Sequence, residues 1–187
     1  MKIRNGLIAL GAGILTVASQ MVLSEDDDRG KKAARWFERS ADVARVDNAQ
    51  YVKECGGCHF PYQPGLLPER SWRKVMNQLK GHFGDNAELP APTHEQVLAY
   101  LVTNSAEHGN YRRSEKILRS IAANDTPDRI TNTPYIRHKH DELPAKFVKG
   151  NDKVGSLSNC AACHTKAEQG SFREGEIRIP GSGAWED

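Results

Sequence analysis

The sequence is short of the residues from which a large hydrophobic core is built. Only 38% of its 187 residues are hydrophobic. A chain this polar either remains disordered or folds around something large and apolar. No segment shows the alternating pattern of a strand, so we expect a mainly α, loop-rich fold. The sequence also has no long run of lysine and arginine, which removes the usual sign of a nucleic-acid-binding protein.

Cysteine is scarce, and none of the four cysteines lies outside two short clusters. Disulfide-rich domains spread their cysteines over several loops, so this distribution does not suggest a disulfide framework. Each cluster instead has the pattern Cys-x-x-Cys-His, at 55–59 and at 160–164. In this pattern two thiols add across the vinyl groups of one porphyrin, and the adjacent imidazole binds its iron. The sequence therefore predicts two covalently bound haem c groups, held by Cys55, Cys58, His59, Cys160, Cys163 and His164.

Three other interpretations of the paired cysteines were weighed. A zinc site could use both pairs, but about a hundred residues separate them, and zinc needs no histidine directly after each pair. A thioredoxin-like redox pair needs a strand–helix context that the sequence does not show. A disulfide between Cys55 and Cys58 would close a very small loop and stabilise little. Two copies of one pentapeptide, which together use every cysteine, favour haem.

The N-terminus has the order of an export signal. Two basic residues precede an apolar stretch at 6–17, and small residues follow. We interpret 1–19 as a secretory signal peptide. The alternative is an uncleaved anchor over 6–23, whose 18 residues are just long enough to span a bilayer. Either version places the rest of the chain in the bacterial periplasm.

Apolar residues recur at helical spacing in four segments. These are 31–46, a stretch that begins at a predicted cap, Ser71, and ends near residue 83, then 94–107 behind a predicted cap at Thr93, and 114–123. Three prolines predict an extended loop at 61–68, and residues from 124 onward are turn-rich. We therefore divide the chain after its signal segment into a linker with an extra helix (20–47) and two cytochrome c-like haem-binding units, 48–110 and 111–187.

The second axial ligand of each iron separates the candidate functions. A filled sixth position favours electron transfer, whereas an open one favours ligand binding or catalysis. Met76 lies on an apolar helical stripe, so we expect it in the core rather than on iron. His138 and His140 are two residues apart and would point in nearly opposite directions from a helix, so one at most should reach a given iron. The residues alone leave five candidates open, namely His82, His94, His108, His138 and His140.

Longer stretches of the sequence resemble the bacterial dihaem cytochrome c family. In the first half these are CGGCHFPYQPGLLP at 55–68, RSWR at 70–73 and HFG at 82–84. In the second half they are RIT at 129–131, TPY at 133–135, KHDELP at 139–144, NCAACH at 159–164 and EIRIP at 176–180. The resemblance covers residues 52–180 in the same order and does not include the segment 31–46.

The resemblance implies that each haem has two histidine ligands, with His82 completing one and His140 the other. It also implies an electron carrier rather than an enzyme. The implied donor is a membrane cytochrome b, and the implied acceptor is a small oxygen-binding monohaem cytochrome, the sphaeroides-type haem protein. Two other functions fit the same motifs. One is an electron-entry subunit of a larger periplasmic reductase, and the other is a dihaem peroxidase, which would need an open sixth position.

Overall fold

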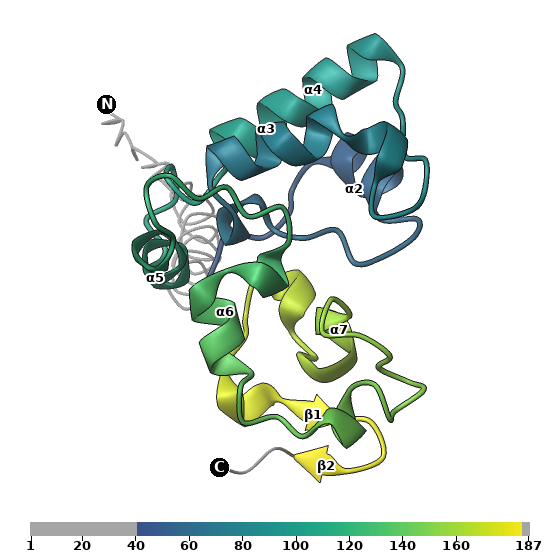
Figure 1. Cartoon of the computed structure of the whole chain (residues 1–187), viewed down its shortest axis with the longest axis vertical. Coiled ribbons are helices and arrows are strands. Elements are labelled where there is room, and N and C mark those ends of the chain that lie inside the picture. Colours follow the sequence, from purple (N-terminus) through teal and green to yellow (C-terminus); the bar gives the residue numbers. More distant parts are fainter. Residues whose placement is uncertain (1–40, 185–187) are drawn as a thin grey trace, which may run out of the picture. The chain divides into compact units, whose positions relative to one another are not determined.

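The computed structural model describes residues 41–184, which are coloured along the sequence in Figure 1. The predicted signal peptide at 1–19, the alternative anchor at 6–23 and the linker before residue 31 lie outside the described residues. Between residues 41 and 184, no helix is long and apolar enough to cross a membrane.

Short helices and loops make up most of the described chain, which confirms the mainly α, loop-rich class. The α-helices are α2 (Ala49–Cys55), α3 (Glu69–Asn77), α4 (Ala91–Thr103), α5 (Arg112–Ser120), α6 (Pro134–Lys139) and α7 (Cys160–Cys163). Between them lie single turns of 3-10 helix, η1 (Pro64–Leu66), η2 (Leu79–Gly81), η3 (Ile130–Asn132), η4 (Ala145–Phe147), η5 (Ala167–Gln169) and η6 (Glu174–Glu176). Two strands of two residues each, β1 (Arg178–Ile179) and β2 (Gly183–Ala184), pair antiparallel near the C-terminus.

The predicted helix starts are displaced by three residues because proline, not a polar cap, marks them. Helix α3 begins at Glu69 directly after Pro68, and Ser71 is buried inside its first turn. Helix α4 begins at Ala91, so Thr93 is helical rather than capping. Proline has a fixed φ and no N–H to leave unpaired, so it is well suited to the start of a helix. The same preference explains α6, whose first residue is Pro134 and which the sequence pattern did not predict.

The segment 41–48 corrects the helix predicted at 31–46, because residues 41–46 are not helical. The backbone N–H groups of Asp42 and Val43 instead donate to the carbonyl of Gly170, at 2.8 and 3.2 Å. Gly170 has φ +74°, and a side chain there would collide with the carbonyl of Val43. The segment is therefore non-helical because it pairs with a distant loop, which outweighs its local helical spacing. The part of the prediction before residue 41 lies outside the described residues.

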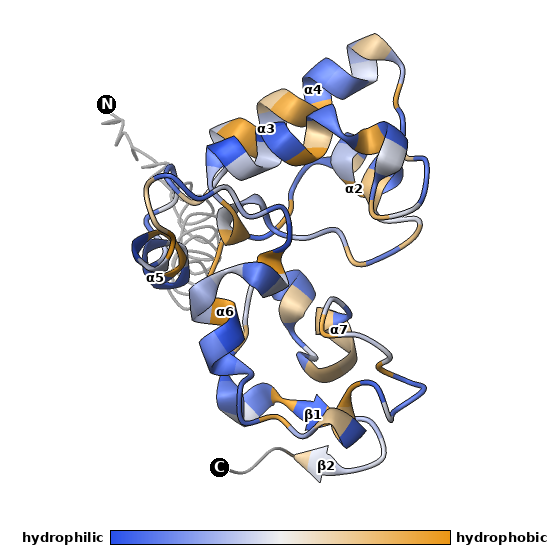
Figure 2. Cartoon of the chain, in the orientation of Figure 1, coloured by the Kyte–Doolittle hydropathy of each residue, from blue (hydrophilic) through white to orange (hydrophobic). Residues whose placement is uncertain are grey.

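The main hydrophobic core lies where α3 packs beside α4, with α2 against α4 (Figure 1). Met76 is 3% exposed within it, which confirms that this methionine packs in the core. The other members of this core are Val43, Tyr51, Leu66, Leu67, Trp72, Leu79, Val97, Leu101, Ile117, Ile121 and Ile130. Helices α5 and α6, by contrast, are mostly blue, the colour of hydrophilic residues, in Figure 2.

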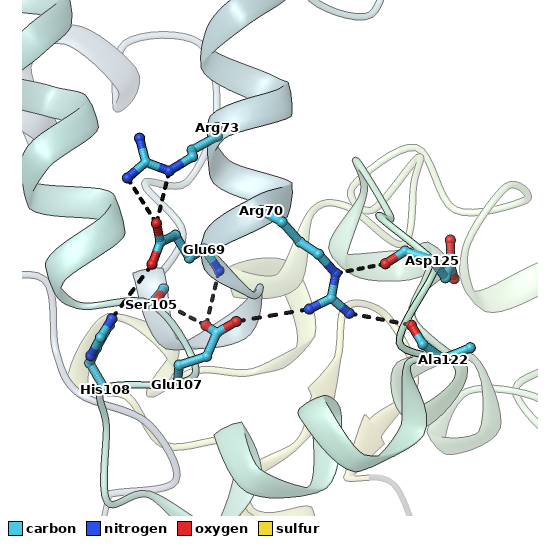
Figure 3. Close-up of polar contacts among 8 residues, drawn as sticks. All are labelled: Glu69, Arg70, Arg73, Ser105, Glu107, His108, Ala122 and Asp125. Carbon is cyan, nitrogen blue, oxygen red and sulfur yellow. Dashed lines mark hydrogen bonds and ion pairs between the residues drawn. The ribbon is translucent and has the colours of Figure 1, made fainter.

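A polar cluster ties the start of α3 to the loops that follow α4 and α5 (Figure 3). The Glu107 carboxylate accepts from the N–H of Glu69 at 2.9 Å and from the Ser105 hydroxyl at 2.9 Å. Arg70 donates to the carbonyl of Asp125 at 2.7 Å. Glu107 therefore caps α3 from a distant loop, since Pro68 offers no side-chain cap of its own.

The connection between the two predicted haem-binding units is packed rather than loose. Ser105 and Ala106 are buried, and the Ala106 N–H donates to the carbonyl of Leu67 at 3.0 Å. Residues 41–184 belong to one compact unit of the chain. The boundary at 110/111 stays a prediction.

Candidate haem-binding sites

The first site is formed by the motif 55–59 and His82. Helix α2 starts at Asn48, whose side chain accepts from the Tyr51 N–H at 2.8 Å, and it ends at Cys55. Gly56 follows, and a Cβ at this position would lie 2.5 Å from the carbonyl oxygen of Val52. A side chain would therefore collide with the backbone here, which favours glycine as the residue after the helix.

His59 faces His82 across a gap of the size that one metal ion fills. The two ring centroids are 6.2 Å apart, and the ring planes are 26° from parallel. His59 Nδ1 lies 2.8 Å from the carbonyl oxygen of Phe60. A hydrogen bond from Nδ1–H to a carbonyl leaves Nε2 as the nitrogen with the free lone pair.

A strained turn aims His82 at this position. His82 ends η2, and its carbonyl accepts from the Asp85 N–H at 3.1 Å. The turn contains Phe83 at φ 53°, a value uncommon for any residue but glycine, followed by Gly84 at φ 112°. Burial lowers the pKa of His82, and the neighbouring His59 lowers it further. Both effects favour the neutral imidazole that binds metals.

The second site is formed by the motif 160–164 and His140. Here the cysteines occupy a single turn, α7, and His164 N–H donates to the carbonyl of Cys160 at 2.8 Å. His164 also forms an isolated β-bridge with Ile177. Burial lowers the pKa of His164 to about 4, with a further contribution from His140, so this imidazole is neutral at ordinary pH.

His140 ends α6 and faces His164. The ring centroids are 6.1 Å apart, and the planes cross at 75°. His140 Nδ1 lies 2.8 Å from the carbonyl oxygen of Ile136, which again leaves Nε2 free. A cavity of about 500 Å³ opens beside His140, and its wall combines the apolar Ile136 and Leu157 with polar side chains that include His138.

The spacing of the two imidazole pairs provides a direct test of fit. Metal–imidazole bonds are about 2 Å long and a ring nitrogen lies about 1.1 Å from its centroid, so two coaxial imidazoles on one metal have centroids about 6 Å apart. Both pairs meet this value. The residues present therefore fit a six-coordinate haem iron at each site.

The other candidate ligands have different partners. His138 is exposed, and its Nδ1 lies 3.0 Å from the Asp141 carboxylate. His94 Nε2 is 3.1 Å from the carbonyl oxygen of Met76, and His108 lies beside Glu69. The structure thus brings His140, rather than His138, to the second motif. His94 and His108 lie outside both sites, whereas His138 lines the cavity beside His140 with its Nδ1 turned to Asp141.

The thiols do not have the character of a redox pair. Burial raises the pKa of the Cys55 and Cys160 thiols to about 11 in each case. Thioredoxin-like cysteines need the opposite shift, because the thiolate is the nucleophile. Within the described residues, no three side chains of His, Cys, Asp or Glu are grouped as metal ligands.

Several residues beside the second site were not predicted from the sequence. Phe172 packs its ring edge against His164, with centroids 5.2 Å apart. The Arg113 guanidinium lies 5.6 Å from the centre of the Phe172 ring and 3.1 Å from the Asp42 carboxylate. Asp42 also accepts from the Phe172 N–H at 2.7 Å. No local signal marks these residues, because they lie in three separate segments of the chain.

Comparison with known proteins agrees with the duplicated motif and the paired imidazoles. A family model described as dihaem cytochrome c matches residues 51–172. The chain belongs to the dihaem cytochrome c family. It is therefore a cytochrome c with two covalently bound haem c groups, and it belongs to the proteins of electron transport. No curated protein gives a significant match.

Solved dihaem cytochromes c are similar in both sequence and fold. The new dihaem cytochrome type c from Shewanella baltica OS155 is 38% identical, with a TM-score of 0.63 over 75% of this chain and 99% of the other. A dihaem cytochrome c from Rhodobacter sphaeroides is 40% identical, with a TM-score of 0.62 over 70% of this chain and 100% of the other. A second structure from that organism is 36% identical, with a TM-score of 0.55 over 68% and 99%.

Proposed function

We propose that this dihaem cytochrome c is a periplasmic electron carrier in which histidines fill both axial positions of both irons. His59 and His82 are the ligands of the first iron, and His164 and His140 are those of the second. The thioether bonds are formed by Cys55, Cys58, Cys160 and Cys163. The observation that supports the assignment best is the spacing of 6.2 and 6.1 Å between the paired imidazole rings.

The ligand set determines what each site can do. Haem iron supplies a one-electron redox couple, and the chain supplies the two imidazoles that hold the iron six-coordinate in both oxidation states. An imidazole replaced by methionine raises the potential, so both potentials here should lie below those of His/Met cytochromes. Peroxide has no open position on either iron. The protein is therefore proposed to be a carrier rather than a dihaem peroxidase.

The proposed partners follow from the family resemblance. A membrane cytochrome b would donate electrons, and an oxygen-binding monohaem cytochrome would accept them. The N-terminal pattern at 1–19 supports export to the periplasm, with a tether through 6–23 as the alternative. An electron-entry subunit of a larger periplasmic reductase would use the same ligands. Copurification with a reductase, instead of rapid oxidation by the monohaem protein, would favour that second function.

The ligand assignment is tested by absorption and EPR spectra of the ferric holoprotein, with and without cyanide. The unmodified protein should be low-spin and should not bind cyanide readily. His82→Ala should convert one haem to a high-spin, cyanide-binding form and leave the other low-spin. His140→Ala should do the same to the second haem.

Matched controls keep this experiment decisive. Each replaces a residue that the structure does not pair with His59 or His164, so the spectra should not change. The control variants are His94→Ala, His108→Ala, His138→Ala and Met76→Leu. A haem opened by His138→Ala but not by His140→Ala would contradict the assignment. An unmodified ferric protein that is partly high-spin and turns over peroxide would contradict the carrier function.

A further inference from the structure

Two consecutive residues of the first half reach both flanks of the second motif. The Tyr62 hydroxyl donates to the carbonyl of Ser158 at 2.7 Å, two residues before the motif 160–164 begins. The Gln63 side-chain amide donates to the carbonyl of Ala167, three residues after the motif ends. The loop that follows the first haem-binding motif therefore holds the second one from both sides.

Tyr62 also touches the first site directly. Its ring stacks on His59, with centroids 4.9 Å apart and planes 26° from parallel. On the other side, the sulfur of Cys160 lies 3.6 Å from the Ser158 carbonyl oxygen that accepts the Tyr62 hydrogen bond. The contacts form a continuous series of residues, His59, Tyr62, Ser158 and Cys160, from one haem-binding motif to the other.

The residues around this series hold it in place. Tyr51, the buried residue of helix α2, donates its hydroxyl to the carbonyl of Tyr62 at 2.8 Å. Gln63 is fully buried. A residue whose own carbonyl is bonded and whose next residue is buried loses little further freedom when its side chain makes contacts, so the geometry of Tyr62 is preorganised.

We propose that Tyr62 is a bridging residue, which fixes the second motif relative to the first and couples electron exchange between the two haems. In that exchange the ferrous haem is oxidised as the ferric haem is reduced, so no proton or external reductant is consumed. Electronic coupling decays faster across a gap between atoms than along covalent and hydrogen bonds. The ring of Tyr62 contacts His59 of the first site, and its hydroxyl bonds to the Ser158 carbonyl beside the second motif. Both contacts shorten the through-space part of the electron path between the two haems. The inference rests on the proposed ligand assignment.

The test uses the full-chain holoprotein with two haems. Tyr62→Phe keeps the ring on His59 and removes the hydrogen bond to Ser158, whereas Tyr62→Leu removes both contacts. Tyr100→Phe is the control, because it removes a hydroxyl whose hydrogen-bond partner is Asp47, with the Asp47 N–H donating at 3.3 Å, within the first half. NMR exchange spectroscopy of half-reduced samples gives the electron-exchange rate between the haems. Circular dichroism of the Soret band gives their relative orientation through exciton coupling.

The expected result is a several-fold lower exchange rate in Tyr62→Phe and a further loss in Tyr62→Leu, with no change in Tyr100→Phe. A changed exciton signal in the two Tyr62 variants would show that the residue also sets the orientation. Unchanged rate and exciton signal in both variants would overturn the proposal, as would an equal effect of Tyr100→Phe. A high-spin haem in Tyr62→Phe would overturn it too, since Tyr62 would then serve ligation. Failure of the ligand assignment is distinguishable, because it appears as high-spin iron in the unmodified protein.

Discussion

The two haem-binding sites of this cytochrome share a motif but are built by different means. At the first site, Cys55 ends a regular helix that packs on α4, and the main hydrophobic core lies behind it. At the second site the cysteines occupy one turn, and none of the buried hydrophobic residues of 131–184 belongs to that core. Its support comes from backbone bonds and from residues far away in the sequence, such as Asp42.

This difference indicates which interactions stabilise each site. Regular helices with an apolar interface can hold the first half together without a cofactor, because burial of apolar surface is the main driving force for folding. The segment 131–184 has four buried apolar residues, Val148, Val154, Ala167 and Ile179, all of them outside the main core. Its folding should therefore depend on the haem itself, which supplies the missing apolar surface.

The largest effect is expected when one haem at a time is removed, because the two halves should then differ in how much structure they keep. Cys160→Ala with Cys163→Ala should leave one haem in the intact mass. It should also abolish the slow hydrogen exchange of residues 140–184, while the α3–α4 region stays protected. The reciprocal Cys55→Ala with Cys58→Ala should leave α3 and α4 measurably protected. Equal loss of protection throughout the chain in both variants would show that the halves do not differ in this way.

The sites also differ in the angle between their imidazole planes, 26° at the first and 75° at the second. Nearly parallel planes split the iron dπ orbitals, whereas nearly perpendicular planes leave them closer in energy. EPR of the ferric protein should therefore contain two low-spin signals, and the second haem should give the more anisotropic one. That signal should disappear in His140→Ala, and the rhombic one in His82→Ala. Two identical low-spin signals would contradict the difference in ring geometry.

A smaller effect is expected where the segment 41–48 supports the second site. Asp42→Ala leaves the Arg113 guanidinium, whose side chain is 16% exposed, without its carboxylate partner. Loss of charged hydrogen bonds of this kind costs about 2 kcal/mol of unfolding free energy. The loss of a nearby negative charge should also raise the reduction potential of the second haem only, since reduction lowers the positive charge on iron.

Two comparisons make the Asp42 experiment specific. Asp42→Asn keeps an oxygen that can accept from the Phe172 N–H, so it should recover stability but not the original potential. Asp47→Ala replaces an exposed carboxylate of the same segment whose partner is Tyr100 in the first half, so it should leave the potential of the second haem unchanged. Redox titration and chemical denaturation measure the two effects. An equal shift in both haem potentials would remove the proposed link to the second site.

The smallest effect is expected in the first half, at the polar cluster of Figure 3. Glu107→Ala removes the group that caps α3 and should cost about 1 kcal/mol, the usual value of a helix cap. Glu115→Ala is a suitable comparison because it breaks only the exposed pair with Arg119 on α5, at 2.9 Å. Pairs of this kind contribute about 0.3–0.5 kcal/mol. Denaturation midpoints should follow that order, and neither variant should alter a haem spectrum.

The local parts of the structure could be predicted from the sequence. Haem attachment uses five consecutive residues, so the motifs 55–59 and 160–164 were recognisable without the fold. Helices α3, α4 and α5 were predicted because their apolar residues recur at helical spacing over two or more turns. Their starts were misplaced because Pro68 and Pro90 begin them, where a polar cap was expected. The short helix α6 has no buried residue and so left no such pattern.

The sequence by itself determined where each haem is attached, because attachment is covalent chemistry between neighbouring residues. Its low hydrophobic content also indicated that a bound group had to supply part of the apolar core. Only the tertiary structure decided which imidazoles face each other. The sequence indicated that one at most of His138 and His140 reaches a given iron but did not choose between them. In the structure it is His140 that lies opposite His164. The non-helical path of 41–48 and the contact of Tyr62 with Ser158 were decided in the same way. These two depend on partners about a hundred or more residues away, and no local pattern encodes a contact at that range.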